Sequence, residues 1–196
     1  MDLQIYNYVE VKNEITQKKA ISYVNSLIDN LKEHRISEDI RITDGNKDNK
    51  DMYASIEIYI GDCVRSEKKL DPNCLLLKMN NKIDKKGKCI IITGSLYELP
   101  GYALYGACDT LNGLENPSKL CVIRKLDEKV FWHEIAHLLG VADHYDYNEK
   151  TGQGDPNNRC SYERNSHYKD CIMQYNPLES KVFCQKAYDE FKKWLN

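Results

Sequence analysis

The chain has 196 residues, with 28 basic and 30 acidic side chains and a formal net charge of −2. This length suits a single domain with a real core, and the near balance of charge argues against a nucleic-acid-binding protein or one that sits on an anionic membrane. No apolar run approaches the roughly 20 residues that cross a bilayer, so we expect no membrane partner. We also expect a monomer with no nucleic-acid partner.

Apolar periodicity predicts alternating strands and helices in the first half of the chain. Residues 3–11 alternate apolar and polar side chains, as a half-buried strand does. Residues 16–34 repeat apolar side chains at helical spacing, which predicts a long amphipathic helix. The remaining segments are predicted to be strands at 39–43 and 53–60, separated by the polar loop 44–51, and then a helix at 71–83.

The second half contains a strand that should be buried on both faces, because residues 88–94 ("KCIIITG") form a continuous apolar run. Strands are also predicted at 101–109 and 120–124. A helix should run from Asp127, a plausible N-cap, to Gly140, a plausible stop. The rest is predicted to be a polar, loop-like stretch at 142–170 and a final helix at 184–195.

The order of these elements predicts an α/β fold in one domain, residues 1–196. An N-terminal subdomain, residues 1–140, would contain the sheet. A small irregular C-terminal subdomain, residues 141–196, would end in a helix. The predicted helix 127–140 would then lie at the junction between the two.

That helix contains a metal-binding pattern, "HEIAH". His133 and His137 are four residues apart, so both imidazoles leave one face of the helix about one turn apart. Two nitrogens so placed can bind one Zn²⁺. Glu134 would point toward the open side of the metal and act as a base toward water, not as a ligand.

The third ligand should follow Gly140, because a glycine there permits a left-handed turn back toward the metal. Asp143 and His144 are both candidates, since carboxylate oxygen and imidazole nitrogen both bind zinc. Neighbouring side chains diverge in an extended segment, so the two should not bind the same ion. If His144 is not the ligand, it could support the site as a neighbour of the ligands.

The segment "HEIAHLLGVADH" resembles the signature of the metzincin zinc endopeptidases, with Asp143 at the position of the third ligand, as in snapalysin-type members. "CIMQY" is similar to the clan's Met-containing turn, with Met173 as a buried residue beneath the metal. Landmarks similar to adamalysin/reprolysin enzymes extend over residues 89–195. The resemblance implies a twisted mixed sheet, favours Asp143 over His144, and gives Tyr175 a role as oxyanion donor.

Eight cysteines are scattered through the chain without a Cys-x-x-Cys pair. This usage favours disulfides and a secreted or extracellular protein, although the N-terminus lacks the features of a signal peptide and eight free thiols in the cytosol are the alternative. The resemblance implies a Cys108–Cys184 disulfide, and Cys160–Cys171 is a second candidate.

These features together predict a zinc metalloendopeptidase. Its peptide or protein substrate would lie extended along the edge strand near residues 101–109. The alternative is a catalytically silent relative that keeps the fold and binds a protein partner. A purely structural zinc site would need four protein ligands, and the sequence supports three.

Overall fold

The computed structural model describes residues 1–9, 13–36, 39–79, 82–83, 87–99, 106–108, 119–147, 154–159, 171–173 and 182–195. The helices and strands are, in chain order, β1 (Asp2–Asn7), α1 (Asn13–Glu33), β2 (Arg41–Asp44), α2 (Gly45–Asp48), α3 (Lys50–Cys63), η1 (Ser66–Lys68), α4 (Pro72–Met79), β3 (Gly87–Ile92), η2 (Gly94–Leu96), β4 (Gly106–Cys108), β5 (Leu120–Ile123), α5 (Glu128–Leu138), β6 (Tyr145–Tyr147), β7 (Gly154–Arg159) and α6 (Gln185–Leu195).

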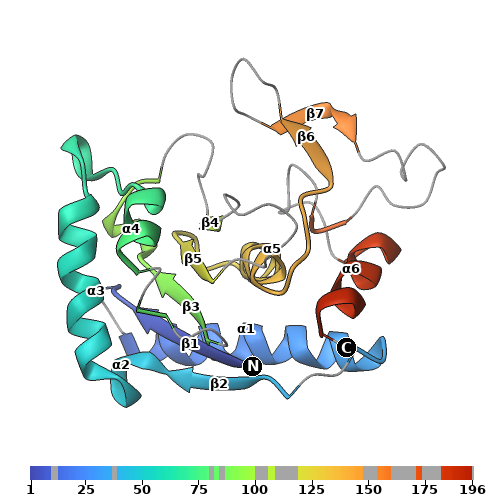
Figure 1. Ribbon diagram of the computed structural model, residues 1–196, viewed down its shortest axis with the longest axis horizontal. Coiled ribbons are helices and arrows are strands. Elements are labelled where there is room, and N and C mark those ends of the chain that lie inside the picture. The colour runs from blue at the N-terminus through green and yellow to red at the C-terminus, as the bar shows by residue number, and fades with distance from the viewer. Residues whose placement is uncertain are drawn as a thin grey trace.

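The main sheet has the strand order β2-β1-β3-β5-β4 (Figure 1). The first four strands are parallel to one another, and β4 is antiparallel to β5 at one end of the order. Helices lie between β1 and β2 and between β2 and β3 in the chain, so the prediction of an α/β fold is confirmed.

Helices cover both faces of this sheet, which explains why β3 is apolar throughout. Ile90 and Ile92 face the core formed with α1, α5 and α6. Cys89 and Ile91 face the second core, formed with α3 and α4. A strand between two cores has no solvent face, so it lacks the alternation of a half-buried strand.

The prediction of a strand at residues 53–60 is wrong, and so is the loop predicted at 44–51. Residues 45–48 form α2, and residues 50–63 form the helix α3, whose N-cap Asn49 accepts a hydrogen bond from the Met52 amide. Its buried residues include Ile56 and Ile60, while Ile58 is 64% exposed. The run of alternating isoleucines favours a strand locally, but the fold buries only those that share one helical face.

Two short strands interrupt the stretch predicted to be loop-like. β6 and β7 form an antiparallel pair that is separate from the main sheet. Their polar sequences, "YDY" and "GDPNNR", carry no apolar alternation from which strands could be predicted.

The C-terminal helix α6 packs against the N-terminal part of the chain. Ala187 and Phe191 belong to the same core as Leu3 and Val24. The Tyr188 hydroxyl donates a hydrogen bond to Asn30 Oδ1 of α1 at 3.0 Å. The last helix is thus joined to the sheet domain by a shared core, and the division at residue 140 stays a prediction.

Candidate metal centre

Helix α5 begins where the sequence predicts. The Asp127 carboxylate accepts hydrogen bonds from the Lys129 and Val130 amides, which caps the first turn. Trp132 Nε1 donates to the Tyr23 carbonyl of α1 at 3.1 Å, so this face of the helix rests on α1. The opposite face is left to carry His133 and His137.

The two histidines meet through their Nε2 atoms, which lie 3.2 Å apart. Both side chains are buried, at 7% and 8% exposure. Each Nδ1 lies 2.8 Å from a main-chain carbonyl oxygen, that of Ile172 for His133 and that of Val141 for His137. These carbonyls fix the orientation of both rings.

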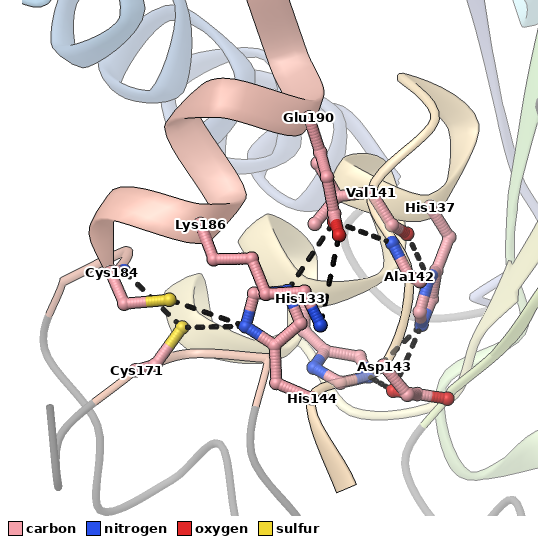
Figure 2. Close-up of polar contacts among 10 residues, drawn as sticks. All are labelled: His133, His137, Val141, Ala142, Asp143, His144, Cys171, Cys184, Lys186 and Glu190. Atoms are coloured by element: carbon pink, nitrogen blue, oxygen red, sulfur yellow. Dashed lines mark hydrogen bonds and ion pairs between the residues drawn. The ribbon is translucent and has the colours of Figure 1, made fainter. Parts of the chain in front are cut away.

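Gly140 allows the chain to turn back toward the histidines. Its φ is +93°, a conformation that favours glycine, and the Val141 amide donates to the Ala136 carbonyl to close the turn. The turn delivers Asp143 to the histidines, with Oδ1 at 3.4 Å from each Nε2 (Figure 2). The left-handed turn predicted from Gly140 is confirmed.

Substitution at Gly140 should therefore be costly. We expect Gly140→Ala to lower the free energy of unfolding by roughly 1–3 kcal/mol, because alanine is strained at this φ. Its added Cβ would also clash with the Trp194 ring. Chemical denaturation of the variant measures the loss.

The matched control is Gly61→Ala in α3, where an added Cβ meets nothing within 4 Å. In a helix this change should stabilise the protein by about 0.5–1 kcal/mol. Equal effects of the two substitutions would contradict the conformational role of Gly140.

The tautomers of the two histidines follow from their carbonyl partners. A carbonyl oxygen only accepts hydrogen bonds, so each Nδ1 is the protonated nitrogen. In the neutral rings each Nε2 then has a lone pair, and both lone pairs point at the same place as Asp143 Oδ1. Three acceptor atoms that converge in a buried space are stabilised by a cation between them, or by a proton on one of the rings.

The pKa values of His137 and Asp143 are shifted in directions that agree with this convergence. Burial alone would lower the pKa of His137, but the Asp143 carboxylate raises it to about 9, with a smaller contribution from Glu134. Burial alone would raise the pKa of Asp143, but His137 and His133 hold it well below its usual range. Without a metal, a proton on the His137 imidazole supplies the positive charge, and the Asp143 carboxylate stabilises it.

The donor atoms fit zinc in kind and spacing. Zinc bonds of about 2.0–2.2 Å to nitrogen and oxygen, at tetrahedral angles, separate the ligand atoms by about 3.3–3.5 Å. The three separations here are 3.2, 3.4 and 3.4 Å. Two imidazoles and one carboxylate make a set that suits zinc and leaves one tetrahedral position open.

Glu134 follows His133 on α5 and is 7% exposed. Its effect on the pKa of His137 places its charge within electrostatic reach of the cluster. It is not part of the group of donor atoms that lie within 4.8 Å of one another. Glu134 is thus a buried carboxylate next to His133 on α5, and its role as a base stays a prediction.

The segment Cys171–Met173 contacts two of the histidines through its main-chain carbonyls. The Ile172 carbonyl orients His133, and the Met173 carbonyl accepts a hydrogen bond from the His144 amide at 2.8 Å. Met173 is fully buried in the core, as a packing residue would be. Tyr175, the predicted oxyanion donor, lies outside the described residues.

His144 points away from the convergent atoms. Its side chain is 2% exposed and lies between Glu190 of α6 and the sulfurs of Cys171 and Cys184 (Figure 2). The sequence places it next to Asp143 but gives no sign of these partners, which lie 27 to 46 residues further along the chain.

Both predicted disulfides are wrong. Cys171 and Cys184 are free thiols, so neither the Cys108–Cys184 nor the Cys160–Cys171 pairing is formed. Pairing of Cys171 with Val182 in a short parallel bridge brings these two cysteines together instead. The disulfide among the described residues joins Cys63, at the end of α3, to Cys74 in α4.

Comparison with known proteins gives no match, either to a protein-family model or to a curated protein. Within the described part of the chain, no helix is long and apolar enough to span a membrane. The convergent atoms of His133, His137 and Asp143, together with the buried Glu134 that follows His133, are the features that point to a function.

Proposed function

We propose that the protein is a zinc-dependent metalloendopeptidase of the metzincin kind. His133, His137 and Asp143 would hold the metal, and Glu134 would act as general base. The observation that carries this proposal is the convergence of three acceptor atoms at tetrahedral spacing, with the tautomers of both histidines fixed by main-chain carbonyls.

When held by His133, His137 and Asp143, zinc would act as a Lewis acid toward the scissile carbonyl and would lower the pKa of a water molecule. The Glu134 carboxylate takes a proton from the attacking water and passes it to the leaving amine. The hydrogen bonds to the Ile172 and Val141 carbonyls keep both imidazoles in place during these transfers. Tyr175 would stabilise the developing oxyanion.

An extended peptide would bind along β4. This strand lies at one end of the main sheet, next to β5, which leads directly into α5. A peptide added there gains main-chain hydrogen bonds, which favour extended substrates of many sequences. The Cys63–Cys74 disulfide is in keeping with an oxidising compartment and a secreted protein.

Chelation tests the proposal. The protein reconstituted with zinc should cleave an unfolded protein, lose this activity together with its zinc after chelation, and recover both when zinc is returned. Metal content is measured by atomic emission, and cleavage by electrophoresis and mass spectrometry of the fragments.

Three outcomes separate the candidate functions. Cleavage that survives removal of all metal would contradict the proposal. Zinc bound without cleavage of any unfolded protein would favour the catalytically silent binding protein. Unfolding of the metal-free chain, with no cleavage when it is reloaded, would indicate a structural zinc site.

A further inference from the structure

His144, Cys171 and Cys184 form a second cluster of side chains that could bind a metal ion. His144, Cys171 and Cys184 are all buried, and one ligand atom of each lies within 4.8 Å of the others. His144 Nδ1 is 3.2 Å from Cys184 Sγ and 3.6 Å from Cys171 Sγ. Figure 2 shows both sulfurs turned toward the same nitrogen.

Glu190 of α6 sets the orientation of the His144 ring. Its Oε2 atom lies 3.3 Å from His144 Nε2 and accepts a hydrogen bond from the Ala142 amide at 3.1 Å. The Nε2–H donates to the carboxylate, which leaves the Nδ1 lone pair directed at the sulfurs. A carboxylate behind a histidine is the usual support of a metal-binding imidazole.

The spacing of the three atoms fits zinc. Bonds of about 2.3 Å to sulfur and 2.0–2.1 Å to nitrogen, at tetrahedral angles, separate nitrogen from sulfur by about 3.5 Å. The two observed separations, 3.2 and 3.6 Å, lie on either side of that value. Thiolate and imidazole together select zinc over hard cations such as Mg²⁺ or Ca²⁺.

We propose that His144, Cys171 and Cys184 bind a second metal ion, a zinc ion, with Glu190 as the carboxylate that orients His144. One tetrahedral position remains for a further ligand. The site is separate from the proposed catalytic centre, because it uses none of that centre's ligands.

The second ion would hold together the segments that build the first site. His144 directly follows Asp143, and Cys171 begins the segment whose Ile172 carbonyl orients His133. Cys184 stands at the start of α6, and its amide donates to Cys171 Sγ at 3.3 Å. An ion shared by these three segments would fix Asp143 and His133 relative to α6.

Cobalt substitution tests this site without depending on catalysis. Reduced, metal-free protein is titrated with Co²⁺, and the near-ultraviolet thiolate-to-cobalt charge-transfer absorption is recorded. We expect this absorption in the wild type, together with protection of Cys171 and Cys184 from alkylation once Zn²⁺ is added. The convergent atoms of His133, His137 and Asp143 include no sulfur and cannot produce the band.

The test variant and its control each replace two buried cysteines by alanine. The double variant Cys171→Ala/Cys184→Ala should lose the band and bind one metal ion fewer per chain. The control Cys89→Ala/Cys121→Ala removes two other buried cysteines that form no disulfide, one in β3 and one in β5, and should keep the band. Glu134→Ala should also keep it, so loss of cleavage and loss of the second ion are distinguishable.

Three results would overturn the proposal. The first is absence of the band in reduced wild-type protein, a measurement that does not depend on the folding of any variant. The second is a band that persists in the Cys171→Ala/Cys184→Ala protein. The third is a disulfide at Cys171 or Cys184, found by peptide mapping, that persists when reduced protein is refolded with excess zinc.

Discussion

Replacement of Glu134 by alanine should reduce kcat/KM for peptide cleavage by about 10²–10⁴-fold or more, while zinc content stays at the wild-type level. General-base catalysis contributes about this much to a hydrolytic rate. Glu134 is buried but is not among the convergent donor atoms, so its loss should spare the metal. Cleavage of a fluorogenic peptide mixture, with metal content measured on the same sample, gives both quantities.

Glu128→Ala is the matched control. Glu128 is the first residue of the same helix and is exposed, and its carboxylate accepts a hydrogen bond from Ser26 at 2.7 Å. This variant should keep activity within a few-fold of the wild type. If Glu134→Ala remains active, or if it loses zinc and fold together, the assignment of Glu134 as the base is wrong.

Asp143→Ala should remove the third donor of the proposed catalytic centre and weaken zinc binding there by more than about 100-fold. Loss of a residue that only supports a ligand costs 10–100-fold, so loss of a ligand itself should cost more. Asp143→His restores the commoner metzincin signature, and imidazole suits zinc, so this variant should bind at least as well. Competition with a zinc-sensitive chelating dye measures both affinities.

His144→Ala provides the contrast at the adjacent position. Its side chain faces Cys171, Cys184 and Glu190, so its removal should leave the metal of His133 and His137 in place. The cobalt charge-transfer band identifies which ion a variant has lost. If His144→Ala loses the metal of the proposed catalytic centre and Asp143→Ala keeps it, the choice of Asp143 is wrong.

Helix α5 and strand β3 could be predicted because their signals are local. Asp127, the helical repeat and Gly140 lie within 14 consecutive residues and specify where the helix begins and turns. The apolar run of β3 is long enough to show that both faces are buried. The spacing of His133 and His137 on a helix likewise brings their side chains together without help from the rest of the fold.

Helix α3 could not be predicted in the same way, because its isoleucines satisfy two periodicities. Ile56, Ile58 and Ile60 alternate as in a strand, and only the packing against α4 and the sheet shows that Ile58 is exposed while the others are buried. Tertiary contacts outweigh a local strand preference of this size.

The contacts of the cysteines could not be predicted from the sequence. Connectivity depends on which segments the fold brings together, and spacing alone does not determine it. Cys171 and Cys184 meet through a bridge between two C-terminal segments, and His144 reaches them only because of the turn that also delivers Asp143. The resemblance to adamalysin/reprolysin enzymes predicted a bond from Cys184 to Cys108, which the structure does not form.

The most direct test of the central claim is the position of zinc in a crystal of the zinc-reconstituted protein, measured by anomalous diffraction on both sides of the zinc absorption edge. We expect an anomalous peak about 2.0–2.2 Å from Nε2 of His133, Nε2 of His137 and a carboxylate oxygen of Asp143. A fully loaded crystal with no peak between these atoms would contradict the proposed catalytic centre. So would a peak there that is bound by His144 in place of Asp143.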